Sequence, residues 1–135
     1  METNFAPATP ESIIFNEDSA DKDFRVESNG NTHMLFVDGG NDKVMIGLET
    51  PETFNGTTPP LQIEGTDNNS GSLSITRNSN DNGQSLLILG KSRGTSVGAD
   101  TVVQDDDGVG EILFTAADGS DRTPQVASVR ASVDG

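Results

Sequence analysis

Aspartates gather in short clusters with glycine and serine, and paired carboxylates of this kind can hydrolyse glycosidic bonds. The candidates are Asp105, Asp106, Asp107, Asp118 and Asp121. A glycosidase holds two carboxyl groups at a fixed separation and keeps one of them protonated in a partly apolar pocket. These clusters instead have the composition of turns, where water keeps carboxylates ionised. The sequence also lacks Trp and Tyr, the aromatic platforms that usually grip a sugar ring. We therefore expect no enzymatic activity.

Calcium is the ion that best suits such side chains, because it prefers carboxylate and carbonyl oxygens. Neither aspartate cluster has the D-x-[DN]-x-[DN]-G spacing of an EF-hand with its distal glutamate. Turn clusters of Asp, Asn and Gly occur throughout β-proteins, and that ordinary role is the favoured interpretation. The weak calcium candidates are Asp105, Asp106, Asp107, Asp38 and Asp42.

His33 is the one histidine of the chain. No G-x-S-x-G elbow accompanies it, so a Ser/His/Asp triad is not indicated. Its place in the run HMLFV favours a residue that flanks a strand, although three copies on a symmetry axis could also bind a metal. Gly90-Lys91-Ser92 is not the end of a phosphate loop, because Ser85 stands where the first glycine is needed.

Composition argues against an independent hydrophobic core. Only 31% of the 135 residues are hydrophobic, and six Phe are the only aromatic residues. A monomer would bury too little apolar surface to offset the conformational entropy of folding. Disorder is one alternative. Completion of the core by copies of the same chain is the one we favour, because the apolar residues recur in regular clusters.

The net charge, the cysteine content and the apolar segments reduce the range of expected partners and sites. The net charge of −14 disfavours nucleic acid and anionic membranes as partners. Without cysteine there is no disulfide framework or thiolate metal site. The first residues lack the basic and apolar regions of a signal peptide, and no apolar run is long enough for a membrane span.

Short apolar clusters separated by Gly, Asn, Asp and Pro predict β-strands and essentially no helix. We expect strands at 12–16, 24–27, 33–37, 44–48, 61–63, 73–76, 85–89, 102–103, 112–114 and 127–133. The run Ser85–Leu89 is the most hydrophobic and is predicted to be the most buried. The organisation predicted is an extended arm at 1–11, a β-repeat segment at 12–50, a Pro-rich linker at 51–60 and a second β-rich segment at 61–135.

The predicted fold class is all-β, a repetitive structure of short strands. A β-sandwich and a triple-stranded β-prism or β-helix both remain open. Apolar stripes only one or two residues wide fit an intertwined homotrimer, in which each chain contributes a narrow wedge to a three-fold axis. A small monomeric sandwich is the alternative. The predicted trimer-core residues are Ile14, Phe24, Val26, Phe36, Val44, Ile46, Leu87, Leu89, Ile112, Phe114, Val129 and Val133.

Two stretches carry a resemblance to known proteins. DFRVESNGNTHMLFVD, from Asp23 to Asp38, and KVMIGLETP, from Lys43 to Pro51, resemble repeats of bacteriophage tail fibres and related virion fibre proteins. LSITR, LLILGKSR and GEILFTAADG in the second half are similar to the same family. Met45 and Leu48 depart from the small residues that are frequent at those positions.

The resemblance implies a structural segment of a trimeric tail fibre that contributes to attachment or host recognition on a virion. Its partners would be further copies of the chain, other virion proteins through the N-terminal region, and a host surface glycan. A capsid head fibre, a polysaccharide depolymerase tailspike and a secreted filament are the alternatives. Related sequences usually continue beyond the equivalent of Gly135, so we expect a fragment, a processed product or a short fibre.

Overall fold

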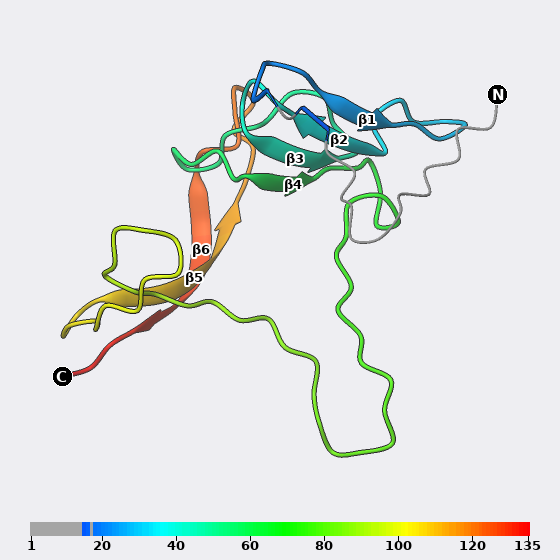
Figure 1. Ribbon diagram of the computed structural model, residues 1–135. Coiled ribbons are helices and arrows are strands. Elements are labelled where there is room, and N and C mark those ends of the chain that lie inside the picture. The colour runs from blue at the N-terminus through cyan, green and yellow to red at the C-terminus, as the bar shows by residue number, and fades with distance from the viewer. Residues whose placement is uncertain (1–14, 17) are drawn as a thin grey trace, which may run out of the picture. The chain divides into compact units, whose positions relative to one another are not determined.

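The structure is a computed structural model that describes residues 15, 16 and 18–135. The chain forms two compact units, one of residues 1–52 and 58–72 and the other of residues 53–57 and 73–135. All six regular elements in the described part are β-strands, as Figure 1 shows. The all-β prediction is therefore confirmed for these residues. No helix among them has the length and apolar character needed to cross a bilayer.

The first unit is built on a four-stranded sheet with the order β1-β2-β3-β4. The strands are β1 (Phe24–Val26), β2 (Leu35–Asp38), β3 (Lys43–Ile46) and β4 (Leu61–Ile63). β1, β2 and β3 are antiparallel neighbours, whereas β4 runs parallel to β3. Alternating patterns and, for β2, the continuous apolar run HMLFV located all four strands to within about two residues, the usual uncertainty of strand ends.

One row of cross-strand partners forms the centre of this unit. Phe36 of β2 pairs with Met45 of β3, which pairs in turn with Gln62 of β4. Met45 is fully buried, and Phe36 and Gln62 are nearly so. The sequence pattern did not identify Met45, because Val44 and Ile46 supplied the expected apolar stripe on the opposite face.

Gln62 also organises the stretch that was predicted to be a Pro-rich linker. Its Nε2 donates hydrogen bonds to the carbonyl oxygens of Glu52 at 3.1 Å and Pro59 at 3.0 Å. The amide nitrogen of Glu52 donates to its Oε1 at 2.9 Å. Both ends of the 52–59 stretch are thus held to β4, whereas residues 53–57 within it belong to the second unit, as do residues 73–135.

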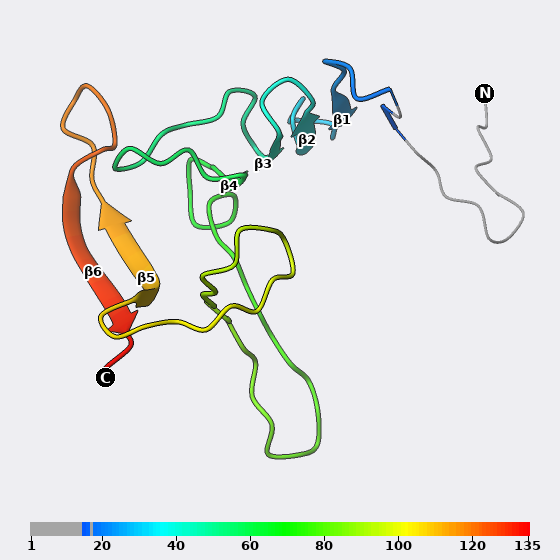
Figure 2. The same cartoon turned by 60° about the vertical axis from the view of Figure 1, so that its left-hand side comes forward.

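The second unit contains one antiparallel hairpin, β5 (Gly108–Thr115) and β6 (Gln125–Ser132). Figure 2 shows the two long strands side by side. Aspartates shape the loop that connects them: Asp118 Oδ1 accepts hydrogen bonds from the amides of Ser120 and Asp121, and Asp121 Oδ1 accepts from the amide of Thr123. The predicted strands at 112–114 and 127–133 are confirmed, with longer bounds on β5.

Three predicted strands of the second unit are wrong for the isolated chain. Residues 73–76, 85–89 and 102–103 are not strands in the structure. Ser85–Leu89 was expected to be the most buried, but Leu86, Leu87, Ile88 and Leu89 are 46–78% exposed. A strand requires a hydrogen-bonded neighbour, and the alternation of side chains reports only the preference for an extended backbone. The predicted arm at 1–11 and most of the predicted strand at 12–16 lie outside the described residues.

Candidate assembly surface

The β5–β6 hairpin has one apolar face and one face of mixed polarity. Ile112 pairs with Val129, Phe114 with Ala127, and Gly110 with Ala131. Because directly opposed residues share a face of the sheet, these six residues form one continuous apolar surface. Glu111 and Arg130 are opposed on the other face.

The apolar face of the hairpin is open to solvent in the single chain. Val129 is 63% exposed, Phe114 is 49% exposed and Ile112 is 45% exposed. A hairpin of two strands is marginally stable in water on its own, and it normally requires a third strand or a covering layer. Within the described residues, this apolar face of the hairpin is therefore largely uncovered.

Leu89 is the neighbour that touches this face. A Cβ atom built on Gly110 would lie 2.7 Å from the Cβ of Leu89 and 3.1 Å from its Cδ1. Gly110 belongs to the same face as Ile112, since side chains two residues apart on a strand point the same way. The hydrophobic run Leu86–Leu89 thus ends on the apolar face of the hairpin.

The sheet of the first unit has a second apolar face. Phe24, Val37, Val44 and Leu61 lie in one row across all four strands. Val37, Val44 and Leu61 remain 36–59% exposed. The buried row of Phe36, Met45 and Gln62 occupies the opposite face of the sheet, as the alternation along each strand requires.

The predicted trimer-core residues therefore divide into classes. Phe36 is buried within its own chain, and Ile14 lies outside the described residues. The others are half-buried or exposed on the two units, where a partner can reach them: Phe24, Val26, Val44, Ile46, Leu87, Leu89, Ile112, Phe114, Val129 and Val133.

Asp107, one of the candidate carboxylates, forms a bidentate ion pair with Arg93. The guanidinium Nε lies 2.7 Å from Oδ2, and Nη2 lies 2.8 Å from Oδ1. The amide of Gln104 also donates to Asp107 Oδ2 at 2.9 Å. Arg93, followed by this amide, holds the pKa of the Asp107 carboxyl well below its ordinary value. A general acid in a glycosidase needs a shift in the opposite direction.

The neighbours of Asp107 shape the backbone. Asp105 Oδ1 accepts hydrogen bonds from the amides of Asp106 and Gly135. Asp106 itself has a positive φ of 66°, a conformation that Asp tolerates in turns. The three consecutive carboxylates therefore take part in a turn before β5.

Asp38 is the more buried of the other two calcium candidates. It is 92% buried as a residue, and its oxygens accept hydrogen bonds from the amides of Gly40 and Asn41 and from the Asn41 side chain. The Asn41 side chain makes the largest contribution to a lowered pKa of Asp38. Asp42 lies in the same turn with a φ of 55°. No cluster of three or more His, Cys, Asp or Glu suited to a metal occurs among the described residues.

His33 is used within the first unit. Its ring packs edge-on against Phe36 with centroids 5.1 Å apart, and its side chain is only 12% exposed. Nδ1 lies 3.0 Å from the hydroxyl of Thr32. These contacts agree with the prediction of a residue that flanks a strand.

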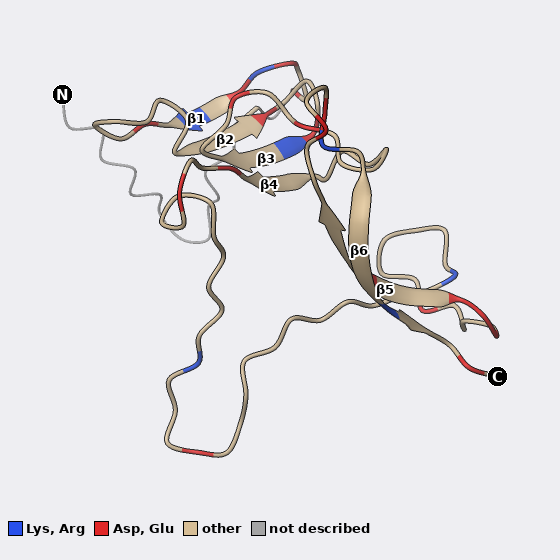
Figure 3. Cartoon of the chain, turned by 180° about the vertical axis from the view of Figure 1, so that it is seen from behind, with Lys and Arg blue, Asp and Glu red and all other residues tan. Residues whose placement is uncertain are grey.

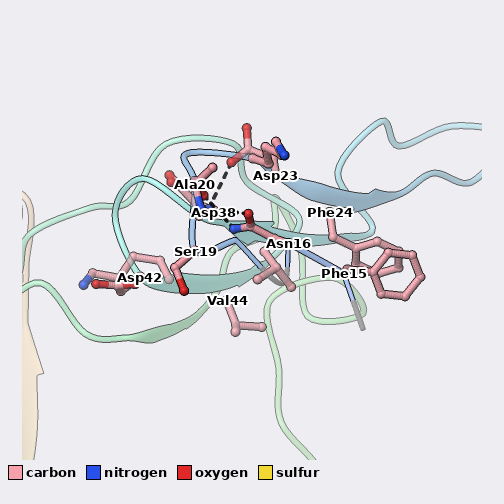
Figure 4. Close-up of a pocket in the computed structure, with 13 residues that line it drawn as sticks. Phe15, Asn16, Ser19, Ala20, Asp23, Phe24, Asp38, Asp42 and Val44 are labelled. Atoms are coloured by element: carbon pink, nitrogen blue, oxygen red, sulfur yellow. Dashed lines mark hydrogen bonds between the residues drawn. The ribbon is translucent and has the colours of Figure 1, made fainter. Parts of the chain in front are cut away.

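The first unit also has an open pocket of about 750 Å³ that the sequence did not indicate. Figure 4 shows Phe15 and Phe24 at one end of it, with ring centroids 4.7 Å apart. Asn16 forms reciprocal hydrogen bonds with the backbone of Ala20, at 2.6 and 3.0 Å. Asp23 Oδ1 accepts from the amide of Gly39 at 3.0 Å. The polar groups of Asn16 and Asp23 thus stabilise the wall of the pocket.

The strongest surface feature is therefore apolar and unpartnered, on the hairpin and along Leu86–Leu89. Comparisons of this chain with protein-family models, with curated proteins and with solved structures find no match.

Proposed function

We propose that the chain is a structural segment of a trimeric, β-rich fibre on a bacteriophage virion, and that it contributes to attachment or host recognition. Its work is assembly rather than catalysis. Three copies cover one another's apolar faces, and contacts of each copy with a host surface glycan add through multivalency.

The observation that carries this proposal is the uncovered apolar face of the β5–β6 hairpin. Its residues are exposed, and so is the run Leu86–Leu89, which reaches Gly110 through Leu89; exposed apolar surface of this kind marks association sites. Further copies of the same chain can cover this surface without any other protein. The open edges of a two-stranded sheet also provide backbone groups for pairing between chains.

The location on a virion is supported by the resemblance of residues 23–51 to fibre repeats, and it depends on that resemblance alone. The low hydrophobic content of 31% and the charge of −14 are compatible with a fibre whose core is shared among chains. A strongly negative surface also keeps such an assembly soluble.

Light scattering on the purified chain, beside a circular dichroism spectrum, tests the proposal directly. We expect a mass three times that of the 14.2 kDa chain, together with a β-type spectrum. A folded monomer would refute the shared core. The same measurement in EDTA tests separately whether the protein binds calcium. Loss of the trimer in EDTA would indicate that carboxylates from different copies bind the ion together.

A further inference from the structure

Residues 73–92 lack backbone partners in the isolated chain. Among the described residues, no hydrogen bond between backbone groups involves this segment; the nearest join Gly71 to Asp67 and Arg93 to Thr101. Figure 1 shows the segment in green as two long arms without strand arrows. Side chains bond the Gly83 amide and the Ser92 carbonyl, but no backbone group in the described part of the chain pairs with the amides and carbonyls of this segment, which leaves hydrogen-bonding capacity for a partner.

The two arms are joined by an ordered turn. Arg77 and Asp81 form a bidentate ion pair at 2.5 and 2.7 Å, and the amide of Gly83 donates to Asp81 Oδ1 at 2.8 Å. A Cβ on Gly83 would collide with the Arg77 guanidinium. The turn therefore fixes where one arm ends and the next begins.

Side chains alternate in direction along the first arm. The hydroxyls of Ser74 and Thr76 lie 3.1 Å apart, so side chains two residues apart point to one side. Leu73 and Ile75 alternate with them and are 70% and 49% exposed. The second arm contains the exposed run Leu86–Leu89. Both arms thus have strand sequences without a sheet.

The charge distribution indicates what kind of partner fits. Residues 73–99 contain three basic residues and one acidic residue, a net charge of +2, so the remainder of the chain carries −16. The stretches 73–76 and 85–90 contain no charged residue at all, and Figure 3 shows them in the neutral colour. Copies that each carry −14 repel one another, and like charges opposed across strands are destabilising. The two uncharged stretches are therefore places where strands of two copies can pair without like charges opposed.

We propose that residues 73–76 and 85–89 become β-strands by pairing with a second copy of this chain. The segment is then an exchange arm, whose ladder hydrogen bonds lie between chains. This inference rests on the proposed self-assembly, and it adds which residues form the interchain sheet. Leu89, seated on Gly110, places the second arm beside the apolar face that the same copies would cover.

Amide hydrogen exchange with mass-spectrometric readout, run beside light scattering, tests the inference on the full chain. In the assembled protein we expect the amides of 73–76 and 85–89 to exchange roughly 100-fold more slowly than those of the 94–100 loop. Leu87→Pro should remove this protection and reduce the mass, because proline cannot donate a ladder hydrogen bond. Within one chain the same substitution removes no backbone hydrogen bond.

Val97→Pro is the matched control. Val97 is fully exposed and precedes Gly98, which has a φ of 79°, in a turn closed by a hydrogen bond from the Ala99 amide to the Ser96 carbonyl. Proline suits this position of a type II turn, so mass and protection should stay unchanged. An assembled protein with fast-exchanging arms, or with Leu87→Pro like the wild type, would overturn the inference alone. A monomer would overturn the proposed function as well.

Discussion

Leu89 and Gly110 approach so closely that a methyl group on the glycine would lie 2.7 Å from the leucine Cβ. The contact joins the hydrophobic run 86–89 to the hairpin face of Ile112, Phe114 and Val129. A glycine in a strand has no side chain, so another segment can pack close to it. At Gly110 the nearest atom is the Cβ of Leu89, which cannot move aside as the end of a flexible side chain could.

Gly110→Ala should therefore displace Leu89 and destabilise the protein by about 1–3 kcal/mol, the usual cost of overpacking. Thermal unfolding at fixed protein concentration measures the effect. Gly90→Ala is the control, because a Cβ at Gly90 would meet nothing within 4 Å. Equal unfolding midpoints for the two variants would show that Leu89 does not pack on Gly110 in solution.

Val129→Asn should dissociate the assembly, because it places an amide at the centre of the hairpin's apolar face and leaves it without a partner on burial. Ser128→Asn makes a polar change at the adjacent position on the opposite face and should keep the wild-type mass. Sedimentation or light scattering at matched concentration distinguishes the two. If Val129→Asn has the same mass in solution as the wild type, the copies do not associate through this face.

The strands were predicted correctly where a second strand follows closely along the chain and can pair with the first. Turns at Ser28–Asn31 and Asp38–Asp42 place β1, β2 and β3 next to one another, so local sequence was sufficient there. Residues 73–76 and 85–89 have equally good strand sequences but no intrachain neighbour. The amino-acid sequence indicates which residues prefer an extended backbone. Whether those residues form a strand depends on whether another strand lies beside them.

The site was predictable only in part for the same reason. Alternation identified the apolar faces of Val44 and Ile46 and of Val129 and Val133. It missed Met45, which is fully buried, because Val44 and Ile46 supplied the expected apolar stripe on the other face of β3. It also did not indicate that Gln62 of β4 hydrogen-bonds the carbonyls of Glu52 and Pro59 in the predicted linker or surface loop. Three prolines and an Asn-Gly pair indicated the turns but not this side-chain contact.

Gln62→Ala should destabilise the first unit by about 1–3 kcal/mol, since the backbone groups of Glu52 and Pro59 lose their partners. Chemical denaturation provides the free energy of unfolding. Asn29→Ala, a truncation of an exposed amide, should be close to neutral. An unchanged stability in Gln62→Ala would mean that water replaces all three hydrogen bonds without cost.

Acid should weaken the protein through Asp107 and its bidentate partner Arg93. Arg93 holds the folded pKa of Asp107 below the ordinary value near 4, so the carboxylate contributes stability above that value. The contribution is lost as the pH falls through the folded pKa. We expect little change in the unfolding midpoint from about pH 7 to pH 5 and a decline below about pH 4. Arg93→Gln should lower the midpoint at neutral pH and make the acid decline shallower.

Arg77→Gln is the comparison, because the Arg77–Asp81 pair lies within one turn, whereas Arg93 and Asp107 are 14 residues apart. The Asp107 side chain is 15% exposed and that of Asp81 is 48% exposed, so solvent screens the Arg93–Asp107 pair less and Arg93→Gln should have the larger effect on the neutral midpoint. Thermal melts of the three proteins across the pH series decide it. An acid profile of Arg93→Gln that overlays the wild type would assign the decline to other carboxylates, of which Asp38, held by Asn41, would be the next to replace.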